Sequence, residues 1–284
     1  MKRRDVLRLS LLLGAPMPTS AKMLTRPIPS TGEQIPVIGM GTWRTFDAEP
    51  DDRLREVLRT FFEAGGRVID SSPMYGRAES TVGELLKSFP DAKPFRATKV
   101  WTSGKEQGIS QIESSIRKLG GCDLLQIHNL ADFKTHLPTL RELKQRGTIR
   151  YWGVTHYQLS AFDELERIVR TEKPDFVQLP YSAGKRAAES RLLPACREHG
   201  AAVLIMQPFA TGALFPKKPV PDWAREIDCA SWPQLLLKFV LGHPAVTCPI
   251  PATSNPKHMA DDVRAGFGKL PDEKMRERIA KEIA

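Results

Sequence analysis

Short apolar segments alternate with amphipathic segments along most of the chain. Beyond residue 24, short runs of apolar and often β-branched residues are each followed by a longer stretch with apolar positions three and four residues apart. The short runs predict buried strands, and the longer stretches predict helices that cover a sheet. Eight such strand and helix pairs can be counted, which is the number in a (β/α)8 barrel.

The predicted barrel strands cover residues 37–40, 67–69, 96–98, 124–127, 151–154, 176–179, 202–205 and 246–249. The predicted helices cover residues 51–64, 79–88, 110–119, 137–146, 160–170, 189–199, 231–241 and 255–265. A small hairpin at residues 24–28 and 34–35 precedes the first barrel strand, and a final helix at 272–283 closes the chain. Glycines that follow predicted helices indicate left-handed caps: Gly65, Gly66, Gly120, Gly121, Gly147, Gly200 and Gly242.

An open, doubly wound sheet is the alternative arrangement for these elements. A dinucleotide-binding sheet of that kind needs the motif G-x-G-x-x-G at the turn after its first strand. Here the first strand leads into Gly39-Met-Gly41-Thr-Trp43, and no third glycine opens a helix. We therefore predict an α/β fold of the (β/α)8 type, a TIM barrel, as a single domain over residues 24–284.

Composition and charge are those of a globular protein with a large core. The chain has 284 residues, of which 41% are hydrophobic and 26% charged, so a disordered or fibrous chain is excluded. The formal net charge of +9 is spread without a run of Lys or Arg beyond the N-terminus, which argues against nucleic-acid binding. The four cysteines are far apart and lack metal-ligand spacing, so we expect free thiols and no metal site.

The first 21 residues have the pattern of an export signal. A basic start with Arg3-Arg4 is followed by a short apolar run and then by small residues suited to a signal peptidase. The arginine pair resembles a twin-arginine signal. We expect residues 1–21 to direct the protein to the twin-arginine export machinery and the periplasm; an amphipathic extension is the alternative, with a cytoplasmic protein if the leader is not used. No other stretch is long enough for a membrane span.

Polar residues follow three neighbouring predicted strands. Asp70, Lys99 and His128 each come at the end of a strand, and Tyr75 lies five residues after Asp70. The carboxyl ends of barrel strands meet at one face and build the active site. A tyrosine hydroxyl beside a lysine could protonate a carbonyl oxygen during hydride transfer, with the aspartate holding the lysine and the histidine orienting the carbonyl. Each residue alone could instead be a cap, a packed aromatic, a surface charge or a core histidine.

The chain resembles aldo-keto reductases at these residues and in several other stretches. The matching stretches are 38–43, 69–76, 97–99, 123–128, 151–156, 177–181 and 250–254. The resemblance implies a (β/α)8 barrel that reduces aldehydes and ketones with a nicotinamide cofactor, usually NADPH. It also implies that Asp70, Tyr75, Lys99 and His128 are the catalytic residues, with Tyr75 as the proton donor.

The resemblance further implies a set of cofactor-binding residues. These are Gly41, Thr42, Trp43, Thr155, His156, Gln178, Met206, Pro208, Phe209, Thr211, Gly212, Leu214, Pro251, Thr253, Ser254, Lys257, His258, Asp261 and Asp262. Thr155, His156 and Gln178 match the positions that bind the nicotinamide carboxamide, and Asp261 with Asp262 are expected to contact the adenine. Met206 stands where the family has a stacking tyrosine. The resemblance implies NADPH as the cofactor. NADH is the alternative, because Ala252 and His258 replace a lysine and an arginine that bind the 2′-phosphate.

The substrate pocket is predicted around five further side chains. They are Trp43, Met74, Trp101, Asn129 and Trp223, and a proline-rich loop at 213–229 is expected to border them. Since the chain stops one helix after the eighth unit, we expect an open site that accepts many carbonyl substrates. A nicotinamide-binding redox sensor with little turnover is the alternative on the same barrel. A glycosidase or metal hydrolase would need a carboxylate pair or ligand cluster that the sequence lacks.

Overall fold

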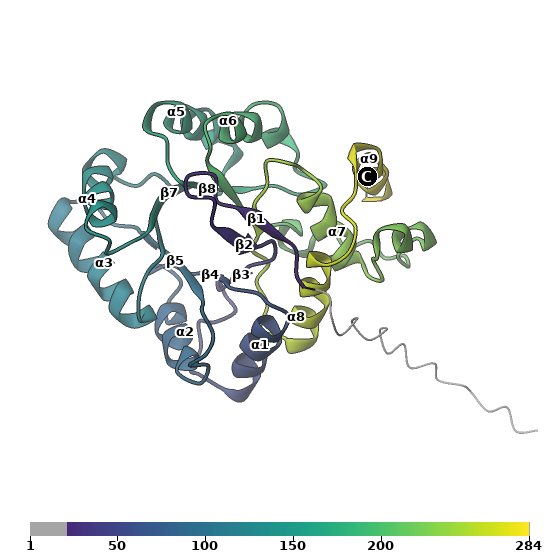
Figure 1. Ribbon diagram of the computed structural model, residues 1–284, viewed down its shortest axis with the longest axis horizontal. Helices are drawn as coiled ribbons and strands as arrows, with labels where there is room; N and C mark the ends of the chain where they lie inside the picture. The colour runs from purple at the N-terminus through teal and green to yellow at the C-terminus, as the bar shows by residue number, and fades with distance from the viewer. Residues whose placement is uncertain (1–21, 284) are drawn as a thin grey trace, which may run out of the picture.

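Eight parallel strands form a ring that is surrounded by helices (Figure 1). The structure is a computed structural model that describes residues 22–283. The barrel strands, in spatial and chain order, are β3 (Met40–Gly41), β4 (Val68–Asp70), β5 (Phe95–Val100), β6 (Leu124–His128), β7 (Tyr151–Thr155), β8 (Phe176–Pro180), β9 (Ala202–Met206) and β10 (Cys248–Pro249). Every neighbouring pair is parallel, so the predicted (β/α)8 barrel is confirmed.

The ring closes between its first and last strands through a short seam. Gly39 N donates to Pro249 O at 3.0 Å, Gly41 N donates to Pro251 O at 2.9 Å, and Gly41 forms a parallel bridge with Ala252. A side chain at position 41 would place its Cβ 2.9 Å from the carbonyl oxygen of Ile250. Glycine is therefore required at this position by the close approach of two backbones.

The helices that cover the barrel are α1 (Asp52–Glu63), α2 (Ala78–Leu86), α3 (Lys105–Leu119), α4 (Phe133–Gln145), α5 (Phe162–Glu172), α6 (Leu192–Glu198), α7 (Trp232–Leu241), α8 (Pro256–Asp262) and α9 (Glu273–Ile283). Their starts follow side-chain caps where the chain supplies one. Asp51 accepts a hydrogen bond from Leu54 N, and Ser231 accepts one from Gln234 N. The predicted cap Asn255 accepts from Lys257 N, which confirms the predicted start of α8.

A two-stranded hairpin fills the amino end of the barrel. It consists of β1 (Thr25–Pro27) and β2 (Gln34–Pro36), which pair antiparallel. Ile28 and Ile35, both fully buried, pack in one cluster with the first residues of the barrel strands, such as Phe95, Tyr151 and Phe176. The hairpin lies across the centre of the view in Figure 1. Since the amino end is plugged, only the carboxyl end of the barrel is left for a site.

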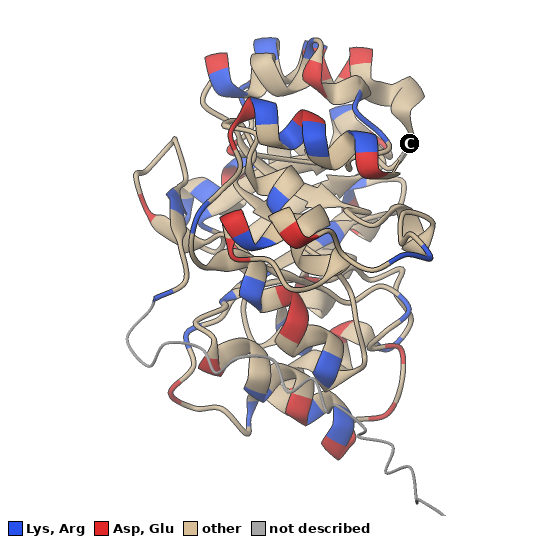
Figure 2. Cartoon of the chain, turned by 90° about the vertical axis from the view of Figure 1, so that its right-hand side faces the viewer, with Lys and Arg blue, Asp and Glu red and all other residues tan. Residues whose placement is uncertain are grey.

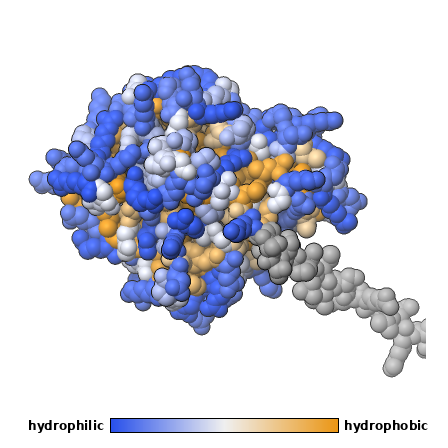
Figure 3. All heavy atoms as spheres, in the orientation of Figure 1, coloured by the Kyte–Doolittle hydropathy of each residue, from blue (hydrophilic) through white to orange (hydrophobic). Residues whose placement is uncertain are grey.

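The outer surface is polar and its charges are mixed. Figure 2 shows basic and acidic residues interspersed along the helices, and Figure 3 shows hydrophilic residues over most of one face with apolar ones between them. Among the described residues, the four cysteines form no disulfide, and three of them are buried. No helix within residues 22–283 is long and apolar enough to cross a membrane.

Two predicted glycine caps, Gly66 and Gly242, are wrong, because neither residue has the positive φ of a left-handed cap. Gly65, Gly120, Gly147 and Gly200 adopt the left-handed conformation that was expected, with φ between 70° and 89°. Gly242 ends α7 with φ −63°, in the right-handed region. A Cβ at this position would lie 2.8 Å from both Arg276 Cδ and Pro271 Cγ. Glycine is needed here for close packing against the C-terminal segment, which has no local signal in the sequence.

Candidate active site

Three barrel strands bring a buried ion pair and a histidine to the carboxyl end of the barrel. Asp70 ends β4, Lys99 lies near the end of β5 and His128 ends β6. Lys99 Nζ donates to Asp70 Oδ2 at 2.5 Å and to the carbonyl of Ser71 at 2.7 Å. Lys99 is fully buried and Asp70 is 2% exposed. Two opposite charges with further hydrogen bonds are the form in which buried ionic groups are tolerated.

The carboxylate and the backbone carbonyl of Asp70 are each held by a further hydrogen bond. Its second oxygen, Oδ1, accepts from Gln126 Nε2 at 3.0 Å. Thr42, at the end of the preceding strand, donates its hydroxyl to the Asp70 carbonyl, and Thr42 Oγ1 also lies 3.0 Å from Ser71 Oγ. Thr42 is fully buried, so in this structure its hydroxyl supports the Asp70 backbone. The carboxylate can therefore turn very little away from Lys99.

Tyr75 lies beside both Lys99 and His128. The Lys99 Nζ is 5.1 Å from the centre of the Tyr75 ring, and the ring meets the His128 imidazole edge-on at 5.9 Å between centroids. Burial raises the pKa of Tyr75, while the Lys99 ammonium acts in the opposite direction and does not offset burial. The pKa of Tyr75 in this structure therefore lies above that of free tyrosine, although the Lys99 charge by itself favours the phenolate.

The charge on Lys99 is secured by its neighbours. Burial by itself lowers the pKa of Lys99, but Asp70 and Tyr75 outweigh burial, and the net pKa lies above the ordinary value for lysine. The ammonium therefore stays protonated at neutral pH, as the sequence reasoning requires.

His128 is held as a neutral imidazole. It is 6% exposed, and burial, followed by the charges of Lys99 and His156, lowers its pKa to about 3. Its Nδ1 lies 3.0 Å from Ser72 Oγ. If the Ser72 hydroxyl donates to Nδ1, the ring proton is on Nε2, a tautomer assigned from this hydrogen bond. His128 is then a hydrogen-bond donor toward the mouth of the barrel.

Thr155 and Gln178, predicted for the nicotinamide end, come together at the ends of β7 and β8. They are register partners, and Thr155 Oγ1 donates to Gln178 Oε1 at 3.1 Å. This bond fixes the amide orientation, and Gln178 Nε2 is buried without a partner among the described residues. An unsatisfied buried donor at this depth is costly, and the carbonyl of a carboxamide is an acceptor that fits it.

His156 lies next to this pair and is only half-buried. Its Nδ1 accepts from Gln158 N at 3.1 Å, and its ring is stacked on Tyr157 with 5.6 Å between centroids. Burial lowers the pKa of His156. The ring is thus fixed at the edge of the mouth in its neutral form.

The loop after β9 carries the next group of predicted cofactor residues. Met206 ends β9 and is partly exposed, Pro208 is buried, and Thr211 and Gly212 are exposed. Phe209 packs on Phe215 at 5.1 Å, and Leu214 packs on Gly184. Three non-glycine residues of this loop, Gln207, Ala210 and Thr211, have left-handed φ values of 55°, 47° and 58°. Such strained backbone persists where the surroundings enforce it, and it is enriched at functional sites.

The residues predicted at the adenine end differ in burial and in hydrogen bonding. Pro251 is buried, Ser254 is half-buried, and Lys257 and His258 are exposed, whereas Thr253 Oγ1 accepts from Asn255 N at 3.0 Å. Asp261 accepts from Ser231 Oγ and Gln234 Nε2 at 2.7 and 2.5 Å. Asp262 is 3% exposed, and burial, followed by the charge of Asp261, holds its pKa well above the ordinary value.

These contacts correct the expectation for the two aspartates. Asp261 binds the start of α7, and the buried Asp262 offers no carboxylate to a ligand at the surface. In this structure Asp261 joins α8 to the start of α7, and the Asp262 side chain is buried in the fold.

Three of the five predicted pocket residues form the rim of the mouth. Trp43, Met74 and Trp101 follow β3, β4 and β5 and are 41%, 39% and 44% exposed. The Trp101 ring is 6.4 Å from the His128 ring, and the Arg44 guanidinium lies 4.3 Å from the centre of the Trp43 ring. Asn129 follows His128 directly, and its buried Oδ1 has no partner among the described residues. Trp223 instead packs against Arg278 of α9, at 4.2 Å.

Two residues of the site were missed by the sequence analysis. Ser72, two residues after Asp70, bonds His128, and Gln126, two residues before His128 in β6, bonds Asp70. The signal was present in the second case, because strand residues two apart point to the same face. No three His, Cys, Asp or Glu side chains gather as a metal site anywhere in residues 22–283.

Comparison with known proteins agrees with the fold and the geometry. The model of the aldo/keto reductase family matches residues 37–282. The methylglyoxal reductase YeaE of Escherichia coli (strain K12) is 30% identical over 241 residues, which cover 79% of this chain and 83% of that protein. An NADH-specific methylglyoxal reductase of the same organism is 28% identical over 224 residues, 66% of this chain and 68% of the relative.

Solved structures show the same similarity. An aldo-keto reductase of Klebsiella pneumoniae, solved in complex with NADPH, superposes with a TM-score of 0.77 at 26% identity, covering 93% of this chain and 95% of that one. The holo form of an aldo-keto reductase from Bacillus halodurans shares the fold with a TM-score of 0.76 at 22% identity, over 92% and 97% of the two chains. Fold and site define a barrel oxidoreductase. The chain belongs to the aldo/keto reductase family.

Proposed function

We infer that the protein reduces aldehydes or ketones to alcohols with NAD(P)H, and that Tyr75 is the proton donor. The observation that carries this inference is the buried Asp70–Lys99 ion pair beside Tyr75, with a neutral His128 on the other side of the tyrosine ring. The family and its reductase relatives support the same reaction. The methylglyoxal reductases among the relatives suggest small carbonyl compounds as first substrates to test.

The chemistry follows from the protonation states of the four side chains. A bound nicotinamide supplies the hydride that forms the new C–H bond, and the electron pair of the carbonyl moves to its oxygen. Tyr75 gives that oxygen its hydroxyl proton, and the Lys99 ammonium stabilises the phenolate that remains. Asp70 holds Lys99 in place and charged. The Nε2–H of His128 orients the carbonyl oxygen toward Tyr75.

The cofactor is held, in this proposal, by residues along the second half of the barrel. Gln178 and Thr155 receive the carboxamide, which would satisfy the partnerless Gln178 Nε2. His156 follows Thr155 in the chain, and Met206, which precedes the loop at 208–214, is the register partner of Pro180 at the end of β8. One similar structure contains NADPH and one relative is NADH-specific, so both NADPH and NADH are candidate cofactors for this protein. We favour NADPH because a similar structure was solved with it. NADH is the second form to test, because Ala252 and His258 stand where the resemblance places a lysine and an arginine for the 2′-phosphate.

The direct test is turnover of the purified full-length protein. Reduced nicotinamide is mixed with methylglyoxal and a panel of other aldehydes and ketones, and nicotinamide absorbance is followed. We expect oxidation of NADPH in wild type, and a loss of about 1,000-fold in kcat for Tyr75→Phe, within the usual contribution of general acid catalysis.

The sensor alternative gives a different result in the same preparation. Nicotinamide fluorescence would then report binding, with no turnover on any carbonyl and no effect of Tyr75→Phe on binding. Folded wild-type protein that oxidises neither NADPH nor NADH would overturn the reductase function.

We also propose that residues 1–21, which lie outside the described residues, are a twin-arginine export signal, and that residues 24–284 are the exported barrel domain. The proposal is supported by the arginine pair, the short apolar run and the small residues that follow. In cells, the double substitution Arg3→Lys with Arg4→Lys should retain the protein in the cytoplasm. Arg8→Lys, which leaves the pair intact, should be exported like wild type. Export would be contradicted if wild type, the double variant and Arg8→Lys were all retained in the cytoplasm to the same extent.

A further inference from the structure

The loop between β5 and α3 is held by side chains from two helical segments. Gln111 of α3 accepts from Trp101 N at 2.6 Å through its Oε1 and donates to Trp101 O at 3.2 Å through its Nε2. His136 Nε2 lies 2.8 Å from the carbonyl of Thr102, and Asp132 Oδ2 accepts from Gly104 N at 2.8 Å. Three side chains thus bind three of the four backbone positions between 101 and 104.

Gln111 differs from the other two because its single amide binds both polar backbone groups of one residue. A donor and an acceptor in one plane fix the orientation of the residue that they bind, and not only its position. The residue is Trp101, which follows Lys99 by two positions and whose ring lies 6.4 Å from His128. Small rotations of the Trp101 backbone would therefore move an indole ring that borders the catalytic residues.

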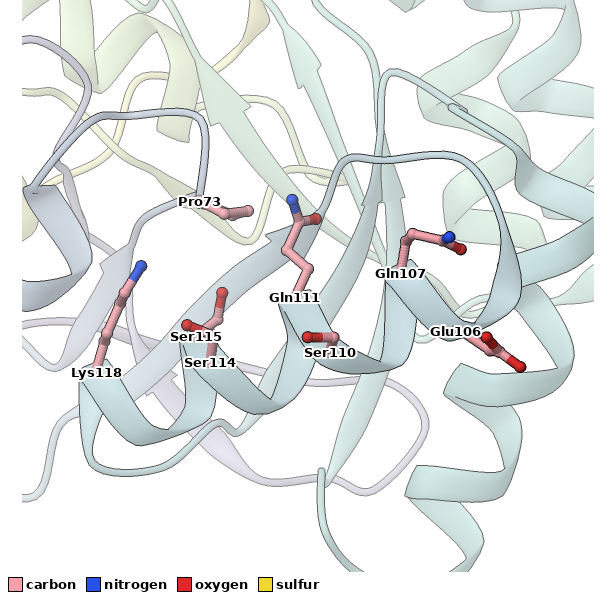
Figure 4. Close-up of a pocket in the computed structure, with 8 residues that line it drawn as sticks. All are labelled: Pro73, Glu106, Gln107, Ser110, Gln111, Ser114, Ser115 and Lys118. Carbon is pink, nitrogen blue, oxygen red and sulfur yellow. The ribbon is translucent and has the colours of Figure 1, made fainter.

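Gln111 lies at a surface hollow that is separate from the proposed catalytic residues. Figure 4 shows its side chain rising from α3 toward Pro73, which belongs to the loop that carries Tyr75. Both residues line a surface hollow of about 580 Å³, together with Glu106, Gln107, Ser110, Ser114, Ser115 and Lys118. None of the four proposed catalytic residues lines this hollow. Gln111 therefore lies outside the group of proposed catalytic residues, and its hydrogen bonds connect it to Trp101.

We propose that Gln111 is a positioning residue that sets Trp101 as the wall for the substituent of the carbonyl substrate, and thereby favours aromatic over small aldehydes. The proposal rests on the proposed function, because it takes the carbonyl oxygen to lie between Tyr75 and His128. The Trp101 ring lies 6.4 Å from the His128 ring and is 44% exposed, so a large substituent of a carbonyl bound at His128 can reach it. A small aldehyde does not reach the Trp101 ring, so its binding should not depend on the position of that ring.

The experiment compares three variants of the full chain on two substrates. Gln111→Ala removes both hydrogen bonds, and Gln111→Glu keeps the acceptor for Trp101 N but loses the donor to Trp101 O. Ser114→Ala is the matched control, because Ser114 lines the same hollow from the same helix and makes no hydrogen bond to the loop. The substrates are benzaldehyde and propanal, and kcat and KM are measured separately at saturating NADPH.

For Gln111→Ala we expect the KM for benzaldehyde to rise about fivefold, the factor that one or two lost hydrogen bonds represent, with kcat nearly unchanged. The KM for propanal should stay at the wild-type value, and Gln111→Glu should lie between wild type and Gln111→Ala. Hydrogen exchange of the Trp101 amide should be faster in Gln111→Ala than in Ser114→Ala. This exchange measurement shows, independently of activity, whether the two hydrogen bonds of Gln111 hold the Trp101 backbone in place.

Three results would overturn the proposal in active enzyme, and the first two concern Gln111→Ala. One is an unchanged KM for benzaldehyde in Gln111→Ala although Trp101 exchange has become faster; the other is unchanged exchange. An equal loss on both substrates would also overturn it, since that pattern indicates general damage. If wild type reduces methylglyoxal but neither benzaldehyde nor propanal, the substrate role of Gln111 fails while the proposed function stands. If wild type reduces no carbonyl compound of the panel, the proposed function fails and the substrate role fails with it.

Discussion

At the scale of single residues, burial decides how the catalytic groups behave. The sequence supplies their identities and their order, since Asp70, Lys99 and His128 end successive strands. It does not supply how deeply each side chain lies. Burial is the first cause of the raised pKa of Tyr75 and of the lowered pKa of His128. The sign for Tyr75 could not be predicted because burial and the Lys99 charge oppose one another.

His128 makes the stability of the fold depend on pH in acid. Its pKa is about 3 in the folded protein and about 6.5 in the unfolded chain. The unfolded chain therefore binds a proton first as the pH falls, and stability is lost between these two values. From pH 6 to 4 the His128 contribution should fall by up to about 1.4 kcal/mol per pH unit. Urea unfolding of wild type and His128→Gln at several pH values measures the difference.

The matched control for this prediction is His258→Gln. His258 is an exposed residue of α8, so its replacement should leave the slope of stability against pH as it is in wild type. A slope in His128→Gln equal to that of wild type would show that the buried imidazole is not the responsible group.

At the scale of elements, the helix and strand types were predictable and some boundaries were not. The helices α3 and α4 begin at Lys105 and Phe133, five and four residues before the predicted starts. Gly108 lies in the first turn of α3 that the prediction left out. Gly108 is tolerated because His136 packs where its Cβ would be. Such compensation comes from another helix and has no signal in the local sequence.

The crossing of α2 and α3 depends on a glycine. A methyl group at Gly83 would overlap the carbonyl oxygen of Lys118 in the backbone of α3. In an isolated helix Gly→Ala stabilises by about 1 kcal/mol, but here the backbone atom cannot move without the helix. We expect Gly83→Ala to destabilise the protein by about 1 to 3 kcal/mol, the usual range for overpacking, in urea unfolding.

Ser80→Ala tests the same helix without the crossing. Ser80 is an exposed residue of α2, so the substitution adds helix propensity and no overlap. It should be neutral or slightly stabilising. Destabilisation by Ser80→Ala of the same size as by Gly83→Ala would point to the helix itself and not to its contact with α3.

At the scale of the whole molecule, a buried arginine fixes the C-terminal helix to the barrel. Arg276 of α9 is 1% exposed. It bonds Tyr181 and Glu189 from the segment after β8, it donates to the Phe239 carbonyl at 3.3 Å, and its guanidinium lies 4.8 Å from the centre of the Phe239 ring. The sequence predicted a final helix but gave no sign of this tether.

Arg276→Met should therefore destabilise the protein. Removing one partner from a buried ion pair costs about 3 to 5 kcal/mol, and because Glu189 is partly exposed, the loss should lie near the lower value. Urea unfolding gives the change, and proteolysis should cut within α9 earlier than in wild type. Arg278→Met is the control, since Arg278 lies on the same helix and half-exposed over Trp223. Equal losses in the two variants would contradict a specific role of Arg276.

The order of the strands also bears on synthesis of the chain. Each barrel strand pairs with the one made just before it, so the sheet can extend as the polypeptide emerges. Asp70, Lys99 and His128 are adjacent once β6 exists. The seam between Gly41 and Ala252 cannot form until nearly nine tenths of the chain has been made. A chain that terminates prematurely before this point carries the three proposed catalytic residues on a sheet with two open edges, the form most prone to pair with another chain.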